Sequence, residues 1–533
     1  MLSASGYATP GNTLTISGMY FIPNGVATLY DGSTQIATVP VKQLLSVVGL
    51  YVGGFQITYT IPYETATGAH TLQAVEQEQS GNLTASTAFT VAASWAQFGF
   101  SPTNTRLNTY ETAISPANVS TLKVAWTYAS NFGFIAPVVV NGDIYFANNN
   151  GSIFAKNAAT GAPVWASTPG GNFGIAGSQA PGLYDGTLFV GSFASIYAAN
   201  ANSGKQAWAS IGQVSADPVY LAEGLVYADD SGMLAAYNPV GCASGSCAPN
   251  WTLSFLSQGI GIGSNMVASG NTYLVAGGYT ATGNGGIFAV DAASHKILWS
   301  GAITTSDRYD GSIVADGGYV FIAYATSNST IPSTLYAFSA SGCGQSTCQP
   351  LWTASISQMG SYANATGLAV ANNTIFVGGA GLYAFPEGGC GASTCSPSWI
   401  GQTSEPGQTA NLMIDSAPAV ANGLVYAGAE DGTVRAFNAN GCGAASCPPV
   451  WNYCTAGSCT PSTAEHFGSP VVLNGMVYIA SYGGTLYAFK LSGATASPPR
   501  GMVSPTHAKP ARASSRQWAR PSIVAPECRP LIW

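Results

Sequence analysis

Tryptophan recurs along most of this 533-residue chain at intervals of 39 to 53 residues. The regularly spaced residues are Trp126, Trp165, Trp208, Trp251, Trp299, Trp352, Trp399 and Trp451. Before most of them stands the same phrase, clearest in APAVANGLVYAGAEDGTVRAF (417–437) and SPVVLNGMVYIASYGGTLYAF (469–489). A repeat of this length indicates that the chain is built from many copies of one supersecondary unit.

Each copy predicts four short β-strands. An apolar strand ends at a turn such as Asn-Gly, and a second strand reads like LVYAG. A third strand reads like TVRAF, and a hairpin then leads to a fourth strand that carries the tryptophan. Four strands in a repeat of about 45 residues are typical of a propeller blade. Solenoids of paired helices have similar periods, but the strong β-formers and Gly turns exclude them.

The number of copies predicts a ring of eight blades within residues 94–493. The units begin at Pro137, Pro181, Pro218, Asn265, Ser312, Leu368, Pro418 and Pro470. The last unit ends at LYAFKLSG (486–493) without a tryptophan strand, whereas VSTLKVAWTY (119–128) supplies such a strand alone. We therefore expect an all-β fold in which strands from the two ends of the ring pair and close it.

The segments on either side of the ring differ from it. Residues 1–93 contain alternating strands such as TLTISGMYF (13–21) and LTASTAFTV (83–91), which predict a small β-sandwich. Residues 494–533 are rich in Pro, Ala, Ser and Arg without periodicity, which predicts a disordered basic tail. The opening MLSASGYATPGN has no basic n-region or apolar h-region, so either a secretory leader has been removed or none was present.

The charge pattern narrows the range of partners. Charged residues make up only 7% of the chain, and those before residue 494 number nine basic and 21 acidic. Nucleic acid is therefore not expected as the main partner, because neutralising phosphates requires clustered cations. The apolar residues are not gathered into a run long enough to span a bilayer, so no membrane span is expected.

Ten of the 11 cysteines form five C-x4-C pairs, namely Cys242/Cys247, Cys343/Cys348, Cys390/Cys395, Cys442/Cys447 and Cys454/Cys459. A structural zinc ion needs four convergent ligands, and pairs on successive repeats lie too far apart to converge. Local disulfides are the favoured interpretation, and no metal site is predicted. Disulfides indicate an oxidising compartment, and we expect an extracellular or cell-surface location.

Two stretches carry a resemblance to known families. WAQFGFSPTNTRLNTYETAISPANVSTLKVAW (95–126), followed by eight copies of V-x-x-G-x-[VI]-Y…GxLYAF…TGxxxW, resembles the quinoprotein alcohol dehydrogenase-like propellers of pyrroloquinoline-quinone (PQQ) repeats. TPGNTLTISGMYFIPNGVATLYDG and IPYETATGAHTLQAV, within residues 1–93, resemble Ig-like modules of bacterial surface proteins. The resemblance implies an eight-bladed propeller preceded by an Ig-like sandwich.

The same resemblance leaves the activity open, because a fold does not define a function. The superfamily contains quinone-dependent dehydrogenases, an outer-membrane assembly lipoprotein and members that only bind. The dehydrogenases place the cofactor on the propeller axis with a calcium ion, an acidic base and often an adjacent-cysteine disulfide. This sequence has no adjacent cysteine pair and few acids in the ring, so no cofactor is expected unless PQQ and calcium bind through other ligands.

A candidate ligand site lies in the loops that enter each innermost strand, since these loops converge around the axis on one face. They contain Gln179, Asp217, Asn265, Asp307, Arg308, Tyr309, Asp310, Asn364, Asp415, Glu465 and His466. One interpretation is a polar ligand site at the mouth of the channel. The other is loop capping with a surface pair between Asp307 and Arg308. No G-x-S-x-G elbow is present, and no catalytic residue is assigned.

The aromatic residues have two interpretations as well. A tryptophan on the outer strand of each blade is expected to pack between neighbouring blades rather than to form a sugar-binding rail. The loop aromatics Phe132, Phe134, Phe173, Tyr309 and Tyr362 are the better candidates for stacking on a glycan.

These observations favour a non-catalytic surface module that recognises a glycan, peptide or protein. A PQQ-dependent sugar or alcohol dehydrogenase is the second hypothesis. A structural subunit of an extracellular assembly, which would self-associate, is the third.

Overall fold

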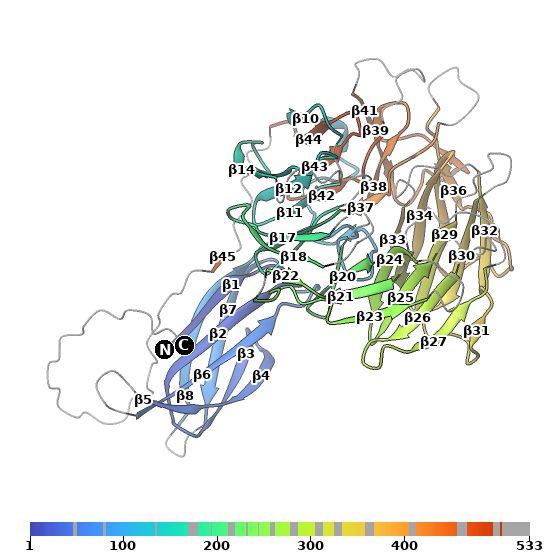
Figure 1. Cartoon of the computed structure of the whole chain (residues 1–533). Helices are drawn as coiled ribbons and strands as arrows, with labels where there is room; N and C mark the ends of the chain where they lie inside the picture. The colour runs from blue at the N-terminus through green and yellow to red at the C-terminus, as the bar shows by residue number, and fades with distance from the viewer. Residues whose placement is uncertain are drawn as a thin grey trace.

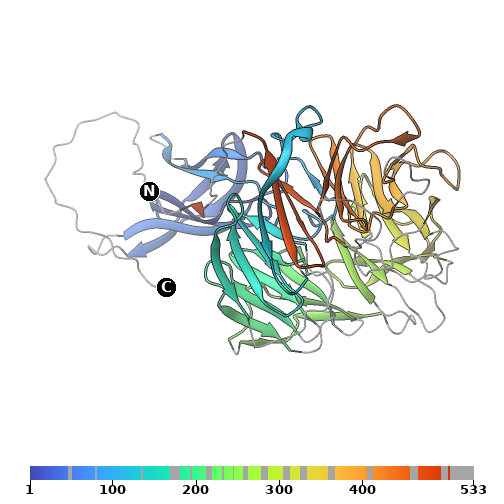
Figure 2. The same cartoon turned by 90° about the horizontal axis from the view of Figure 1, so that it is seen from above.

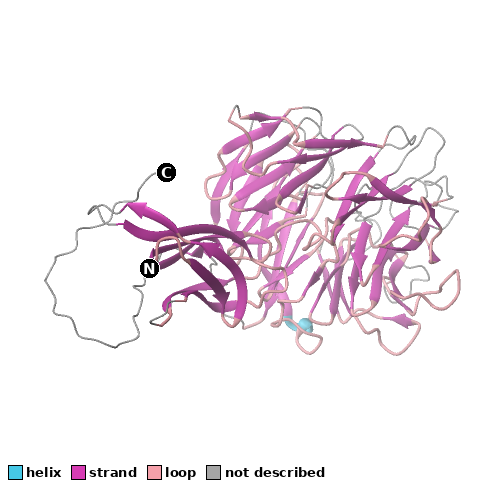
Figure 3. Ribbon diagram, turned by 90° about the horizontal axis from the view of Figure 1, so that it is seen from below, coloured by secondary structure: helices cyan, strands magenta, loops and turns pink. Residues whose placement is uncertain are grey.

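The computed structural model describes two all-β units that lie side by side (Figure 1). It describes residues 1–45, 51–77, 81–133, 136–168, 180–192, 195–211, 219–230, 233–243, 245–255, 262–277, 286–303, 313–324, 333–357, 367–404, 412–455, 466–493 and 502–503. Apart from one 3-10 turn at Val119–Thr121, the regular structure of these residues consists of strands (Figure 3). Among them, no helix has the length and hydropathy needed to cross a bilayer.

The first unit is a sandwich of two antiparallel sheets, as the alternating sequence predicts. One sheet contains β1 (Leu2–Tyr7), β2 (Thr13–Phe21), β6 (Tyr51–Thr60) and β5 (Lys42–Leu45). The other contains β4 (Thr34–Pro40), β3 (Val26–Asp31), β7 (Gly68–Glu76) and β8 (Leu83–Val91). Their inward residues, such as Leu14, Ile16 and Leu72, share one buried core. Of the predicted tail, the structure describes β45 (Met502–Val503), which pairs with β1.

The described residues after the sandwich form eight sheets of four or five strands. The first four sheets are β11 (Val138–Val140), β12 (Asp143–Ala147), β13 (Ile153–Asn157), β14 (Pro163–Ser167); β15 (Gly182–Tyr184), β16 (Thr187–Gly191), β17 (Ile196–Asn200), β18 (Gln206–Ser210); β19 (Tyr220–Ala222), β20 (Leu225–Asp230), β21 (Met233–Tyr237), β23 (Trp251–Ser254); and β24 (Ile262–Ser269), β25 (Thr272–Gly277), β26 (Gly286–Asp291), β27 (Ile297–Gly301).

The other four are β28 (Ile313–Asp316), β29 (Tyr319–Tyr324), β30 (Ser333–Ser339), β32 (Trp352–Ile356); β33 (Leu368–Ala371), β34 (Thr374–Gly379), β35 (Gly381–Pro386), β36 (Trp399–Gly401); β37 (Ala419–Ala421), β38 (Leu424–Ala429), β39 (Thr433–Asn438), β41 (Trp451–Cys454); and β42 (Val471–Leu473), β43 (Met476–Ala480), β44 (Thr485–Leu491), β10 (Leu122–Ala129).

Two sets of contacts close these sheets into a ring. Strand β10 pairs with β44, which joins the two ends of the ring as predicted (Figure 2, cyan beside red). The first strands of the sheets also follow one another around the axis, and β42 of the last sheet contacts β11 of the first. A closed ring leaves no sheet edge at its centre open to another chain.

The tryptophans pack between neighbouring sheets, as predicted. Six of the eight lie on the outer strand of one sheet, against a turn glycine of the next sheet. An added Cβ at these glycines would lie only 2.2–2.8 Å from the indole; they are Gly161, Gly204, Gly241, Gly342, Gly389 and Gly441. The indole N–H groups of Trp126, Trp165 and Trp208 donate to carbonyls of the same hairpins, at 2.9, 2.7 and 3.1 Å. The repeat therefore encodes the joint between sheets.

Three of these hairpins, here called the turn joints, are closed by hydrogen bonds alone. They are residues 157–161, 200–204 and 291–295. In each, the first side chain, Asn157, Asn200 or Asp291, accepts the backbone N–H three residues later, at 3.0, 3.1 or 2.7 Å. In the third turn joint His295 replaces the glycine, and its ring stacks on Trp251 with 4.0 Å between the centroids.

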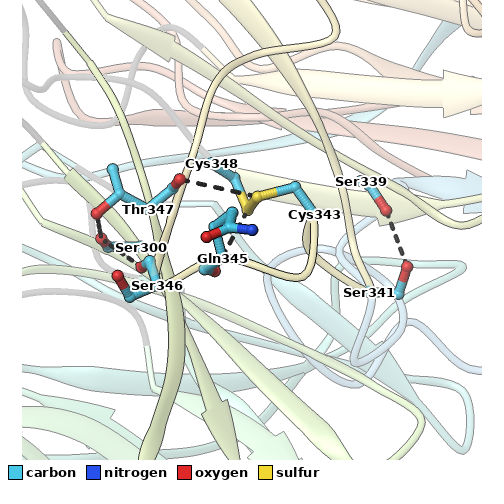
Figure 4. The surroundings of a disulfide bond; sticks show 8 residues. All are labelled: Ser300, Ser339, Ser341, Cys343, Gln345, Ser346, Thr347 and Cys348. Carbon is cyan, nitrogen blue, oxygen red and sulfur yellow. Dashed lines mark hydrogen bonds between the residues drawn. A yellow bond between two sulfur atoms is a disulfide. The ribbon is translucent and has the colours of Figure 1, made fainter.

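Four hairpins, here called the cysteine joints, carry the predicted disulfides Cys242–Cys247, Cys343–Cys348, Cys390–Cys395 and Cys442–Cys447. Figure 4 shows the second of them. Each extends the preceding sheet by a short parallel contact. Strands β22 (Ser246–Cys247), β31 (Thr347–Cys348) and β40 (Ser446–Cys447) pair with β18, β27 and β36, and Thr394 bridges to Thr353. Cys454 is also disulfide-bonded, whereas Cys459 lies outside the described residues.

Candidate functional site

A segment that follows the sandwich in the sequence, residues 95–108, runs around the axis at one end of the ring and is here called the strap. It hydrogen-bonds to the first strand of each of the eight described sheets, in chain order. The partners are Trp95–Val139, Ala96–Leu183, Gln97–Leu221, Pro102–Ala268, Thr103–Ala315, Thr105–Val370, Arg106–Val420 and Asn108–Val472, at 2.6–3.0 Å. The inner edges of these strands would otherwise present unpaired backbone groups, which are costly to leave buried.

The two ends of the ring differ, because the strap contacts only one of them. Its contacts lie toward the end of each first strand, next to the turn that leads to the second strand. The loops predicted to hold the ligand site enter the first strands from the opposite end. The channel is therefore bridged by the strap at one end, and the predicted site belongs to the other end, which we call the mouth.

Two strap side chains, Phe98 and Arg106, are buried against each other. Phe98 packs with Ala136 and Ala180, which precede β11 and β15 on the mouth side. The guanidinium of Arg106 lies 3.8 Å from the centre of the Phe98 ring, and its Nη1 donates to the Phe98 carbonyl at 3.2 Å. Arg106 is fully buried, and its Nε and Nη2 have no hydrogen-bond partner among the described residues. Burial lowers the pKa of Arg106 to about 9, so the side chain remains a cation at neutral pH.

At the mouth, Asp415 and His466 meet from neighbouring sheets. Asp415 precedes β37 and His466 precedes β42, and Asp415 Oδ2 lies 2.7 Å from His466 Nδ1. The Asp415 side chain is 1% exposed and that of His466 is 19% exposed. The structure thus brings together two of the predicted site residues, which are 51 positions apart.

The protonation of this pair follows from its surroundings. Burial raises the pKa of Asp415 to about 6, although the hydrogen bond from His466 opposes the rise. The hydrogen bond to Asp415 raises the pKa of His466, and the nearby carboxylate of Glu430 raises it further. Glu430 is held by the Met413 N–H at 3.2 Å. The pair is therefore poised to hold a proton near neutral pH, and it can donate a hydrogen bond or a positive charge to a ligand.

The remaining predicted site residues fall into two groups. Gln179, Asp217, Asp307, Arg308, Tyr309, Asp310, Asn364 and Glu465 lie outside the described residues. Asn265 was expected in a loop, but it lies within β24, because a bulge between Ile262 and Asn265 lets this strand begin earlier. Among the candidate glycan-stacking aromatics, Phe132 is 45% exposed. Phe134, Phe173, Tyr309 and Tyr362 lie outside the described residues.

Sequence reasoning missed Phe98 and Arg106. Both lie in the stretch that carried the family resemblance, but that stretch has no strand periodicity that would place it on the axis. The one available signal was an arginine in a ring with very few basic residues.

The quinone cofactor implied by the resemblance can be tested against the donor groups present. PQQ in such propellers is bound together with calcium, which takes six to eight oxygen ligands. Within the described ranges, no three His, Cys, Asp or Glu side chains come together. The disulfides lie on the hairpins between sheets, away from the first strands that surround the axis. The described residues alone provide no ligand set for a quinone–calcium pair, and we derive no step through one.

Comparisons with known proteins agree with the ring. Residues 95–174 match the family model of the glucose/ethanol/alcohol dehydrogenase β-propeller domain, and residues 149–240 and 332–496 match that of the outer membrane protein assembly factor BamB. No curated protein matches the chain in sequence.

Solved structures with similar folds are distant in sequence. Quinohemoprotein alcohol dehydrogenase from Comamonas testosteroni is 15% identical with a TM-score of 0.53, over 76% of this chain and 81% of that one. A europium-containing methanol dehydrogenase is 14% identical with a TM-score of 0.53, over 75% and 98%. BamB from Moraxella catarrhalis is 14% identical with a TM-score of 0.48, over 70% and 99%. The chain is thus an all-β protein whose ring is a β-propeller of PQQ-like repeats.

Proposed function

We propose that the protein is a non-catalytic recognition module of the cell surface or extracellular space, which binds a glycan, peptide or protein partner at the mouth of its propeller. The observation that carries this proposal is the strap. It hydrogen-bonds to all eight described first strands, which supports a rigid ring whose opposite end is left for recognition. Rigid rings that present loops on one face are suited to recognition.

Three further features support the proposal. The described disulfides are compatible with an oxidising compartment outside the cytoplasm. The Asp415–His466 pair supplies a polar, partly exposed contact at the mouth. The matched family model of the assembly factor BamB describes a protein that acts in assembly, which favours a macromolecular partner.

The test is a search for a ligand with a matched pair of variants. Wild-type protein is applied to glycan and peptide arrays beside His466→Ala and His70→Ala. His70 forms a similar pair with Asp31, at 3.0 Å, but on the sandwich. We expect a ligand that binds wild type and His70→Ala and is lost in His466→Ala. A ligand retained by all three proteins would contradict a site at the mouth.

The second candidate is a PQQ-dependent sugar or alcohol dehydrogenase, favoured by the match of residues 95–174 to the dehydrogenase propeller model. Titration with PQQ and calcium, followed by absorbance and a dye-coupled oxidation assay, separates the candidates. Saturable binding with substrate-dependent dye reduction would replace the proposal with this one.

A third candidate, a subunit of an extracellular assembly, is favoured by exposed apolar side chains beside the regularly spaced tryptophans. Val164, Leu298, Leu351 and Val450 each directly precede one of these tryptophans and are 46, 51, 52 and 39% exposed. Stable oligomers in size-exclusion chromatography, dispersed by changing these residues to serine, would support this candidate.

A further inference from the structure

A cavity of about 640 Å³ lies between the sandwich and the ring. Its walls come from three places: sandwich residues 60–63 with Gly11, strap residues 101–103, and the turn 221–225 of the third sheet with its neighbours. This volume is within the range of roughly 300–1,000 Å³ of small-ligand pockets, which often form at domain interfaces. Because turn 221–225 follows a first strand, the cavity lies at the strap end of the ring, away from the mouth.

Hydrogen bonds hold the two units together around this cavity. Thr13 donates its backbone N–H to Asp185 Oδ1 at 2.8 Å, and the Asp185 N–H donates to Asn12 Oδ1 at 2.7 Å. The Tyr110 hydroxyl donates to the carbonyl of Tyr63, a residue of the cavity wall. The walls from both units are thus fixed relative to each other, and the cavity is preformed.

One wall residue departs from the pattern of the repeats. The turn after each first strand begins with a residue of positive φ. These residues are Asn141 (53°), Asp185 (44°), Glu223 (48°), Gly270 (57°), Gly317 (52°), Asn372 (51°), Asn422 (45°) and Asn474 (53°). Gly, Asn and Asp tolerate this conformation, whereas other side chains adopt it rarely. Glu223 is the exception among the eight, and it is an exposed residue of the cavity wall.

The residues that line the cavity indicate which kind of ligand Glu223 would bind. The described lining residues include no Lys, Arg or His, and Glu223 forms no ion pair with a described basic side chain. Tyr63 and Tyr184 contribute aromatic rings. Beneath the turn, Tyr227 donates to Tyr273 at 2.7 Å; burial raises the pKa of both phenols and the Glu223 carboxylate adds to the rise. A carboxylate among aromatic rings, with no competing cation, is a setting that favours an organic cation.

We propose that this cavity binds the ammonium or guanidinium group of a lysine or arginine side chain from a peptide partner, with Glu223 as the counter-ion. The proposal goes beyond the recognition proposed at the mouth, since it concerns the opposite end of the ring. The acidic character of the chain before residue 494, with 21 acidic and nine basic side chains, would steer such a partner toward it.

The first test measures binding of a fluorescein-labelled Gly-Gly-Lys-Gly-Gly peptide to the full chain by anisotropy, beside the same peptide with glutamine. We expect the lysine peptide to bind at least tenfold more tightly. Glu223→Gln should remove this preference, and added salt should weaken it. The matched control is Glu64→Gln, which removes an equal charge from the sandwich outside the cavity wall; it should change binding less than twofold.

A second variant separates the ligand from the fold. Glu223→Asn restores the residue type used in the corresponding turns, so its unfolding temperature should equal or exceed that of wild type while the lysine preference is lost. Equal binding of both peptides by wild type, or an unchanged preference in Glu223→Gln and Glu223→Asn, would overturn the proposal. Binding of a neutral oligosaccharide that Glu223→Gln leaves unaltered would overturn it as well.

Discussion

The turn joints and the cysteine joints both pack against the outer tryptophan of the preceding sheet. They differ in how much of the indole they shield from solvent. Trp208, Trp299, Trp352 and Trp399, which face cysteine joints, are 2, 4, 3 and 7% exposed. Trp126, Trp165 and Trp251, which face turn joints, are only partly buried. The longer, disulfide-closed hairpin adds a strand to the neighbouring sheet and shields the indole, whereas the five-residue turn covers one face of it.

The comparison indicates that each cystine stabilises the contact between two sheets as well as the hairpin that contains it. In one cysteine joint the N–H groups of Ser300, on β27, and of Ala302, directly after this strand, donate to carbonyls on either side of Thr347, at 2.8 and 2.7 Å. The Ser300 hydroxyl adds a bond to the Ser346 carbonyl at 3.1 Å (Figure 4). A cystine that fixes this hairpin therefore also preserves the edge that the neighbouring sheet uses.

The largest expected effect distinguishes the buried from the half-buried tryptophans. Trp208→Ala should lower the free energy of unfolding by about 3–5 kcal/mol, because it leaves a cavity over Gly241 and an unpaired Pro239 carbonyl. Trp165→Ala should cost clearly less, since part of its indole already faces water. Denaturant unfolding of the two variants is the measurement, and equal losses would remove the distinction between the joints.

The next effect concerns the cystine itself. Replacing both Cys343 and Cys348 by serine should lower the free energy of unfolding by about 2 kcal/mol, the loop-closure contribution of so short a ring. Hydrogen exchange should become faster at the Ser300 and Ala302 amides, which bond to this hairpin. The corresponding amides beside Cys390–Cys395 provide the internal control. Unchanged exchange at Ser300 would show that the cystine does not support the neighbouring sheet.

In a turn joint the corresponding loss is smaller. Asn157→Ala removes the acceptor for the Thr160 N–H and hydroxyl and should cost about 1 kcal/mol. Asn200→Ala, which removes the same bond to Ser203, should cost a similar amount. Thermal unfolding of both variants checks this. A loss as large as that of the cystine variant would mean that the hydrogen-bonded turn is no weaker a joint.

The smallest expected effect is that of His295→Gly. Glycine relieves the positive φ of 55° but removes the ring that stacks on Trp251. Each contribution is worth about 1 kcal/mol, and they oppose each other, so the net change in unfolding free energy should stay within about 1 kcal/mol. A larger loss, measured by denaturant unfolding, would show that the stacked pair is the main contact of this joint.

The features that could be predicted from the sequence are those encoded locally. Turn residues, the strand pattern and the C-x4-C spacing indicated the strands, the closing pair β10–β44, the tryptophan packing and the disulfides. The bulge in β24 could not be predicted in this way, because nothing in the residues before Asn265 distinguishes an early strand start from a loop. That the sandwich is Ig-like stays a prediction.

The candidate site depended more on contacts between distant residues. Both Asp415 and His466 were assigned to the mouth, but not their hydrogen bond, since local sequence does not specify the direction of a side chain. The strap joins residues up to 364 positions apart, as between Asn108 and Val472, and its sequence has no regular pattern. Glu223 had a visible signal: Glu-Gly stands where most repeats carry Asn-Gly, Asp-Gly or glycine.

The ordered contacts of the strap also tie its length to the number of repeats in the ring. Within residues 95–108 it hydrogen-bonds to one first strand after another, so each repeat has its own contact position along this short peptide. In a chain that lost or gained a repeat, the later first strands would no longer meet their contact positions. The strap is also synthesised before the strands that it joins, and its last contact needs β42, so full registration must wait until the final repeat has emerged. Evolution by repeat duplication would therefore have to change the strap together with the number of repeats in the ring.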